Sequence, residues 1–261
     1  MAADTSPGLC RIALVLEYDG TDFSGWQVQP RGRTVQGELI RALSRLMEAR
    51  VSIQGASRTD AGAHALYQVA AFTAPRRYPP EVLRSALNAY LPPDIRVVGA
   101  YEAPPNFDPR RHATRRQYRY LVWNRREPSP LWRRFAFHCP TPLDIHSMQD
   151  TASLMVGTRD FASFSGAPGR RSTLRTVSRV GVECKEHLVV FTVEGKAFLP
   201  GQVRRMVGTL LEVGKGKLDK DGVKALLESP KTSTAGPALS PCGLFLTRVD
   251  YPNFLPVQEA P

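Results

Sequence analysis

One short loop carries the residues best suited to chemistry. Residues 55–65 read Gly-Ala-Ser-Arg-Thr-Asp-Ala-Gly-Ala-His-Ala, so Arg58 stands two positions before the carboxylate of Asp60. A neighbouring cation keeps a carboxylate ionised, and an ionised carboxylate can act as a nucleophile beside a polyanionic substrate. The small residues around it allow a ligand to approach the backbone closely. The same composition also suits an ordinary turn in which Asp60 only caps the backbone, so the loop alone leaves both interpretations open.

Regular elements must hold this loop, and hydrophobic patterning predicts them along most of the chain. Apolar, β-branched runs predict strands, and apolar residues repeating at three and four positions predict helices. We expect strands at residues 11–18, 67–72, 96–101, 117–124, 176–182, 188–193 and 244–249. We expect helices at residues 34–49 with Thr34 as the cap, from Pro79-Pro80 with Val82, Leu83, Ala86 and Leu87 inward, and at residues 143–156, 202–213 and 220–228. This order predicts an α+β fold.

A proline-containing segment at residues 104–114 reads as a linker between two halves. The N-terminal half then covers residues 11–103 and the C-terminal half residues 115–252, each with mixed strands and helices. Residues 1–10 and 253–261 are expected to be tails, and the Gly/Pro/Arg-rich residues 166–172 a mobile loop.

Charge points to the kind of partner. The formal net charge is +11 over 261 residues, which favours nucleic acid, an anionic membrane surface or an acidic protein. Arginines gather around residues 117–124, where they alternate with Tyr118 and Trp123, and this mixture suits phosphate contacts together with base stacking. A sheet edge protected by charge is the alternative. We favour contact with RNA because the charge is so one-sided.

Other features exclude several classes of protein. The four cysteines are widely scattered and, like the five histidines, show no spacing typical of a metal site, so we expect no metal and reduced thiols. We find no secretory signal pattern and no apolar run of about 18 residues, which predicts a cytoplasmic protein without a membrane span. No phosphate-binding Gly-x-x-x-x-Gly-Lys motif of an ATPase is present.

The loop at residues 55–65 resembles the active-site motif of the TruA family of tRNA pseudouridine synthases. Supporting resemblances follow along residues 11–252. They are Tyr-Asp-Gly followed by Gly-Trp-Gln at residues 18–27, Asp-Phe-Ala-Ser-Phe at 160–164, Gln-Val-Arg-Arg-Met-Val-Gly at 202–208 and Gly-Leu-Phe-Leu at 243–246. One departure is Pro200-Gly201, which stands just before the Val-Arg of the helix and changes how that helix begins.

The resemblance implies a tRNA pseudouridine(38–40) synthase, an isomerase that acts on the anticodon stem-loop of tRNA without a cofactor. It also implies a cytoplasmic homodimer. The implied fold has two similar α/β subdomains whose antiparallel sheets join around a central RNA-binding catalytic cleft, the pseudouridine synthase fold.

Matching positions imply the roles of individual residues. Asp60 is the nucleophile, and whether it attacks the sugar C1′ or the base C6 stays open. Arg58 displaces the target base, Tyr118 stacks on the uracil, Arg204 pairs with Asp60, and Leu244 lines the uracil pocket. We expect further RNA contacts from Arg110, Arg111, Arg115, Arg116 and Arg205.

Two other functions fit parts of the sequence. A non-catalytic RNA-binding protein would share the charge and the aromatic residues, but it would not need Asp60, and losing that negative charge would tighten its binding to RNA. A hydrolase with an Asp nucleophile usually needs a second carboxylate or a metal. The loop supplies neither, which counts against a hydrolase.

Overall fold

The structure is a computed structural model and describes residues 9–75, 78–166, 172–252 and 254–255. The chain divides into two compact units. Unit 1 comprises residues 1–114 and 248–261, and unit 2 comprises residues 115–247. The expected C-terminal half, residues 115–252, therefore differs from unit 2 at its end. Most of the expected tails, residues 1–10 and 253–261, lie outside the described residues. The same holds for most of the expected mobile loop at residues 166–172.

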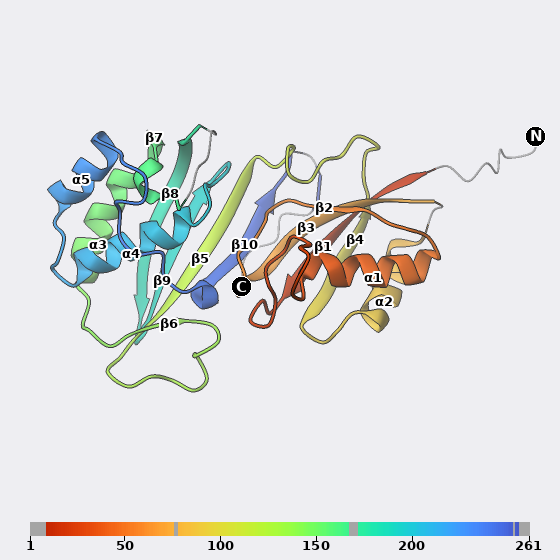
Figure 1. The fold of residues 1–261 in the computed structure, drawn as a ribbon, viewed down its shortest axis with the longest axis horizontal. Helices are drawn as coiled ribbons and strands as arrows, with labels where there is room; N and C mark the ends of the chain where they lie inside the picture. The colour runs from red at the N-terminus through yellow and green to blue at the C-terminus, as the bar shows by residue number, and fades with distance from the viewer. Residues whose placement is uncertain (1–8, 76–77, 167–171, 253, 256–261) are drawn as a thin grey trace, which may run out of the picture. The chain divides into compact units, whose positions relative to one another are not determined.

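Unit 1 is built on a sheet in the order β4-β1-β3-β2. The strands are β1 (Cys10–Tyr18), β2 (Ile53–Gly55), β3 (His64–Ala74) and β4 (Ile95–Glu102), and the helices are α1 (Val35–Met47) and α2 (Pro80–Tyr90). All three pairings in this order are antiparallel, and β1 lies in the middle with Leu14 opposite Ala70 and Ala100. Figure 1 shows α1 and α2 beside these strands.

The helices of unit 1 begin where the sequence signals predict. The Thr34 hydroxyl accepts a hydrogen bond from Gly37 N at 3.2 Å, which confirms it as the cap of α1. In α2 the expected inward positions Leu83 and Leu87 are fully buried, but Val82 is 58% exposed, so its placement was wrong. Val82 lies one residue, about 100° of helical rotation, from the buried stripe.

The segment before residue 114 packs on unit 1. Arg11 Nε donates to Phe107 O at 3.0 Å, and the Phe107 ring meets Tyr251 with centroids 5.1 Å apart. The Tyr251 hydroxyl donates to Pro109 O at 2.6 Å, and Thr114 N donates to Asp250 O at 2.9 Å. These contacts explain why the residues after Thr247 belong to unit 1.

Unit 2 holds the strands of the order β10-β5-β9-β8-β7, with β6 beside β5. They are β5 (Arg115–Asn124), β6 (Phe137–Cys139), β7 (Gly157–Asp160), β8 (Leu174–Lys185), β9 (Leu188–Gly195) and the unit-2 part of β10 (Leu244–Asp250). The expectation of antiparallel sheets needs a correction, because β5 and β6 run parallel. Residues 125–136 form a connection long enough for the chain to turn back, so that β6 lies parallel to the last three residues of β5, Val122–Asn124.

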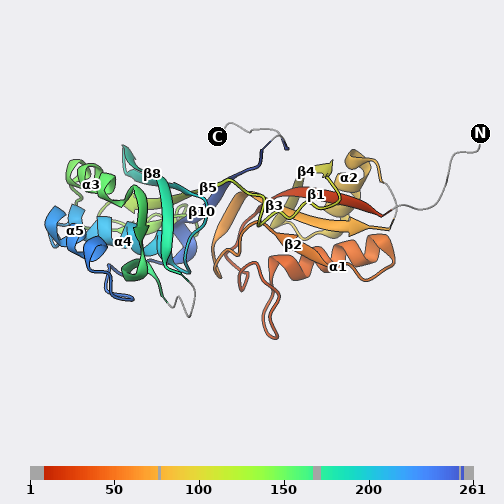
Figure 2. The same cartoon turned by 90° about the horizontal axis from the view of Figure 1, so that it is seen from above.

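Helices cover one face of these strands. The helices are α3 (Ile145–Ala152), α4 (Gln202–Gly214) and α5 (Lys220–Glu228), with short 3₁₀ turns η1 (Ser153–Met155), η2 (Ala162–Phe164) and η3 (Pro241–Gly243). Figures 1 and 2 both show α3, α4 and α5 on one side of the strands. The expected helix at 143–156 is shorter, because Asp144 caps its start and its last turn tightens into the 3₁₀ turn η1.

The Asp-Phe-Ala-Ser-Phe motif serves packing within unit 2. Ser163 is fully buried, and its hydroxyl donates to Leu226 O at 2.8 Å and accepts from Lys231 N at 3.1 Å. One hydroxyl thus ties η2 to the end of α5 and to the segment that follows it. Phe161 and Phe164 flank it and are also fully buried.

Candidate active site

The candidate loop at residues 55–65 joins β2 to β3. The two strands pair antiparallel, and Ala56 N donates to Val69 O at 2.7 Å, so the base of the loop is closed by backbone hydrogen bonds. The loop turns where Ala63 N donates to Asp60 O at 3.1 Å. Arg58 is exposed and Asp60 partly exposed, whereas Thr59 between them is buried. The guanidinium and carboxylate therefore stand at the accessible side of an anchored loop.

Buried polar side chains of β1 and β3 support the loop from below. Gln68 on β3 is fully buried, and its amide accepts from Ser57 N at 3.1 Å and donates to Ser57 O at 2.8 Å. The hydroxyl of Tyr18 on β1 lies 2.8 Å from the Thr59 hydroxyl, and Gln68 Nε2 donates to Tyr18 at 3.4 Å. The backbone is thus held on both sides of Arg58.

The Tyr-Asp-Gly…Gly-Trp-Gln stretch supports the loop from a second side. Trp26 N donates to Thr59 O at 3.1 Å, and Gly62 N donates to Phe23 O at 3.1 Å. Trp26 and Phe23 are buried in the core of unit 1. Gly25 has a φ of +90°, and a Cβ there would lie 2.9 Å from Thr59 O, so this close backbone approach requires glycine.

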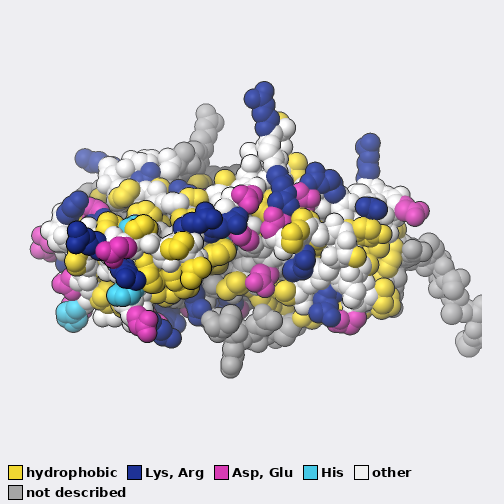
Figure 3. Space-filling view, turned by 90° about the horizontal axis from the view of Figure 1, so that it is seen from below, with side chains coloured by type: hydrophobic (Ala, Val, Ile, Leu, Met, Phe, Trp, Pro, Cys, Tyr) yellow, Lys and Arg dark blue, Asp and Glu magenta, His cyan; other side chains and the backbone are white. Residues whose placement is uncertain are grey.

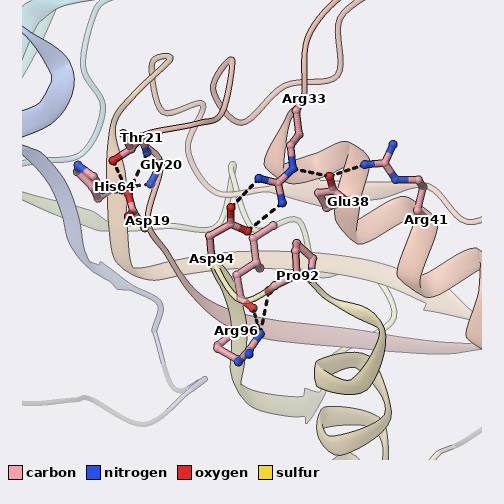
Figure 4. A network of polar contacts seen from close by, with 11 residues as sticks. Asp19, Gly20, Thr21, Arg33, Glu38, Arg41, His64, Pro92, Asp94 and Arg96 are labelled. Atoms are coloured by element: carbon pink, nitrogen blue, oxygen red, sulfur yellow. Dashed lines mark hydrogen bonds and ion pairs between the residues drawn. The ribbon is translucent and has the colours of Figure 1, made fainter. Parts of the chain in front are cut away.

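The end of the loop is fastened through His64, the first residue of β3. Its side chain is 1% exposed, and its Nδ1 accepts from Gly20 N at 3.1 Å (Figure 4). Asp19 Oδ1 lies 3.2 Å from the same nitrogen and accepts from Thr21 N at 3.0 Å. A Cβ on Gly20 would lie 1.9 Å from Ala63 O, so only glycine fits against the loop here.

The supporting stretch at residues 18–27 is itself held by Arg33, whose contacts we call the arginine clamp. Arg33 forms two hydrogen bonds with the carboxylate of Asp94, at 2.6 and 2.9 Å, and a third with Glu38 at 2.8 Å (Figure 4). The hydrogen bonds that Arg33 donates to Asp94 and Glu38 raise the pKa of its guanidinium. Its guanidinium also lies 4.2 Å from the centre of the Phe23 ring. Arg33 O accepts from Ser24 N at 2.7 Å, so the clamp and the supporting stretch are directly joined.

Tyr118 lies in unit 2, on β5. Its side chain is 7% exposed, and its ring meets Phe198 edge-to-face with centroids 5.5 Å apart. Gly201, of the Pro200-Gly201 departure, is the cap of α4 with a φ of +70° and no side-chain cap. The Gln202 Oε1 accepts from Leu199 N at 2.8 Å, just before the helix.

Arg204 lies near Tyr120, the next residue after Tyr118 on the same face of β5. Leu244 follows Gly243, where an added Cβ would lie 3.0 Å from the Tyr120 ring. Burial raises the pKa of Tyr120 well above its usual value, and the charge of Arg204 acts on it in the opposite direction. The Tyr120 hydroxyl donates to Ser240 O at 2.6 Å, which holds the turn leading into the buried Leu244. Each unit thus gathers its own candidates: Arg58 and Asp60 in unit 1, and the remaining three around β5 in unit 2.

The expected RNA-binding arginines differ in their surroundings. Arg110 and Arg111 are exposed on unit 1, where Asp108 accepts hydrogen bonds from both backbone N–H groups. Arg115 pairs with the buried Glu194 at 3.1 Å, and Arg116 is 6% exposed and donates to Lys196 O. Arg205 donates to Gly236 O at 3.3 Å. Arg110 and Arg111 are therefore better placed to reach a phosphate than Arg116.

Charge on one face of the molecule is mixed rather than concentrated. The face drawn in Figure 3 carries Lys and Arg side chains at many separate points, interspersed with Asp and Glu. RNA contacts on this face would therefore depend on individual side chains rather than on one uninterrupted basic patch.

Sequence reasoning missed the residues that support the loop. Gln68 offered a signal, because it is the one amide within the apolar run at residues 67–72. Arg33 and Asp94 offered none, since they are 61 residues apart.

Three further observations concern other classes of site. Among the residues that the structure describes, no group of three or more His, Cys, Asp or Glu side chains is placed to hold a metal ion. The four cysteines, all within the described ranges, form no disulfide. In the same part of the chain the longest helices have 13 residues, and none has the length and apolarity needed to cross a bilayer.

Comparison with known proteins gives consistent matches. A family model described as tRNA pseudouridine synthase matches residues 14–110 and 151–252. The chain is 44% identical over 243 residues to tRNA pseudouridine synthase A of Myxococcus xanthus, covering 92% of each protein. It is 42% identical over 241 residues to the protein of the same name from Geobacter sulfurreducens, covering 92% of this chain and 99% of that one. A solved Cbf5-Nop10-Gar1 complex aligns with a TM-score of only 0.37 at 13% identity, over 90% of this chain and 49% of that one, and carries no weight.

Proposed function

Because this chain belongs to the family of tRNA pseudouridine synthases, we propose that Asp60 is the nucleophile with which it converts uridine to pseudouridine in tRNA. The chain is an isomerase of this family. The reaction breaks the N-glycosidic bond of uridine, turns the base and joins its C5 to the sugar, with loss of the hydrogen at C5. No electron is gained or lost overall, so the chemistry requires no redox cofactor.

One observation carries the assignment of Asp60. The loop at residues 55–65 is anchored from two sides by buried contacts, yet it leaves Asp60 and Arg58 accessible. A loop that served only as a turn would not need support of this density. A carboxylate held on a rigid backbone meets the reacting atom without first being ordered, which is how a nucleophile gains rate from positioning.

The other site residues then have specific tasks. The uridine must leave its stack to be reached, and Arg58, two positions before the nucleophile in sequence, fills the space that it leaves. Tyr118 stacks on the uracil, and Leu244 lines its pocket. Arg204 pairs with Asp60 and keeps it ionised.

The substrate and assembly follow from family membership. We propose that the enzyme modifies positions 38 to 40 of the anticodon stem-loop as a cytoplasmic homodimer. Its two units would form the pseudouridine synthase fold around a central RNA-binding cleft. Arg110, Arg111 and Arg205 would contribute phosphate contacts. Two further arginines already have partners, Arg115 with Glu194 and Arg116 with Lys196 O. They would contribute chiefly by shaping the RNA-binding surface.

Tritium release tests the function and the nucleophile together. With tRNA labelled at uracil C5, the wild-type protein should release tritium in the presence of EDTA and without an added cofactor. Asp60→Asn should release none, yet still bind tRNA. Asp221→Asn, which alters an exposed carboxylate in the first turn of α5, serves as the matched control and should keep full activity.

The outcomes separate the claims. If Asp60→Asn also releases tritium, the enzyme class stands and the nucleophile is another residue. If folded wild-type protein releases none from several tRNAs, the protein is a non-catalytic RNA-binding member of the family.

A further inference from the structure

The amide of Gln68 is an unusual feature of the core of unit 1. It is 0% exposed in the middle of β3, and its neighbours Val69 and Ala70 are equally buried. Burying an amide costs free energy unless hydrogen bonds replace those that it made with water. Gln68 recovers them chiefly with both backbone groups of a single residue, Ser57, in the loop at residues 55–65.

The amide also belongs to a chain of buried polar groups that ends at Thr59, the residue before the candidate nucleophile. Gln68 Nε2 lies 3.4 Å from the Tyr18 hydroxyl, and that hydroxyl lies 2.8 Å from the hydroxyl of Thr59, the residue before Asp60. The side chains of Tyr18 and Thr59 are 3% and 6% exposed. Hydrogen bonds in such a dry network are strong and geometrically demanding. This hydrogen-bond network therefore holds the backbone of Ser57 and the side chain of Thr59, on either side of Arg58.

We propose that Gln68 is a positioning residue for the reaction, acting through Ser57 and the Tyr18–Thr59 hydroxyl pair to set the direction in which the Asp60 carboxylate points. The inference rests on the proposed role of Asp60. Gln68 itself touches neither substrate nor reacting atoms. Its amide is well suited to the task, because only a side chain with both a donor and an acceptor can hold the N–H and the C=O of one residue at once.

The consequence is a loss of rate rather than of affinity. Without the amide, the two backbone groups of Ser57 must seek other partners, and the loop will sample more than one conformation. A displacement of about 1 Å of a catalytic group can cost about 100-fold in rate. The tRNA contacts spread over other residues stay in place, so binding should change little.

The central experiment compares Gln68→Met with Asn88→Leu. Methionine keeps the unbranched shape of glutamine without its hydrogen bonds. Asn88 is a matched control, because its amide also pairs with both backbone groups of one residue, donating to Val97 O at 2.9 Å and accepting from Val97 N at 2.8 Å. It joins α2 to β4 in the same unit and does not contact the loop at residues 55–65 in any hydrogen bond described above. The rate of tritium release at saturating tRNA, the KM for tRNA and the thermal midpoint are measured for each.

We expect Gln68→Met to lower kcat by about 10- to 100-fold with KM within about threefold of wild type, the pattern of a lost transition-state interaction. Asn88→Leu should lower the thermal midpoint comparably and keep kcat. A wild-type kcat in folded Gln68→Met, or an equal fall of kcat in Asn88→Leu, would overturn the proposal.

Tyr18→Phe keeps the test decisive if Gln68→Met does not fold. It removes one hydroxyl and keeps the aromatic ring, and it breaks the same hydrogen-bond network at Thr59. A reduced kcat with unchanged KM supports the proposal, and an unchanged kcat overturns it. Asp60→Asn is assayed alongside. An inactive Asp60→Asn together with fully active Gln68→Met refutes only the positioning role, whereas an active Asp60→Asn removes the premise as well.

Discussion

Replacing Arg33 by methionine should destabilise unit 1 by an amount that reveals how strongly the arginine clamp is held. The change keeps the aliphatic part of the side chain and removes the guanidinium. Three charged hydrogen bonds are lost, two to Asp94 and one to Glu38, together with the contact over the Phe23 ring. The carboxylates of Asp94 and Glu38 then remain near each other without the cation between them.

The magnitude lies between two known limits. Breaking a fully buried ion pair costs about 3–5 kcal/mol, and an exposed pair is worth about 0–1 kcal/mol. The side chains of Arg33 and Asp94 are 34% and 25% exposed, so solvent screens part of the attraction. The paired geometry of the guanidinium and carboxylate adds strength. We expect a loss of about 2 kcal/mol for Arg33→Met, and about half of that for Arg33→Lys, which keeps the charge but not the fork.

Tryptophan fluorescence can assign the effect to unit 1. Of the three tryptophans, Trp26 lies in unit 1, and Trp123 and Trp132 lie in unit 2. With the latter two changed to phenylalanine, urea unfolding followed by fluorescence reports unit 1 alone. Arg41→Met is the matched control, because Arg41 also pairs with Glu38 but is 69% exposed, and its loss should cost less than about 0.5 kcal/mol.

A loss below about 0.5 kcal/mol in Arg33→Met would refute the reasoning. It would mean that the clamp behaves as an ordinary surface pair despite its geometry. An equal effect of Arg41→Met would refute it too, since exposure would then not decide the strength of these pairs.

Two further predictions concern other parts of the molecule. Ser163→Ala should destabilise unit 2 by about 1–3 kcal/mol, because Leu226 O and Lys231 N lose a buried partner. Thermal unfolding measures this loss, with Ser229→Ala at an exposed position as the control. Equal thermal midpoints for the two variants would contradict the prediction. Burial alone would raise the pKa of Glu38, but hydrogen bonds from Arg41 and Arg33 outweigh it and hold that pKa below its usual value of 4.5. A carboxyl group whose pKa is lower in the folded state stabilises the fold at pH values above its unfolded-state pKa. This stabilisation is lost as the pH falls through the folded-state pKa. The stability gap between wild type and Glu38→Gln, measured by urea unfolding, should therefore be widest near neutral pH and shrink below about pH 4.5; a gap that stays constant down to about pH 3.5 would exclude this linkage.

Much of the local structure was accessible from the sequence because the signals that specify it are contiguous. The apolar repeat and the cap at Thr34 predict α1, and the alternation of residue types predicts the strand at residues 117–124, whose burial alternates in the structure. The candidate loop was recognisable for the same reason, since Arg58 and Asp60 lie two positions apart in one chain segment. Local propensity failed where a weak element depends on a partner strand, as in β6, which has three residues and pairs with β5.

What only the tertiary structure decided is how the loop is held and which charges are accessible. Gln68, Tyr18 and Thr59 come together because β1 and β3 pair, and the sequence around Tyr18 carries no sign of its contact with Gln68, 50 positions later. Arg33 and Asp94 meet across 61 residues. Arg110 and Arg116 look alike in the sequence, yet one is exposed and the other lies buried on β5. Sequence patterns report the neighbours of a residue along the chain, whereas hydrogen bonding and burial depend on neighbours in space, and these exist only after the strands have paired.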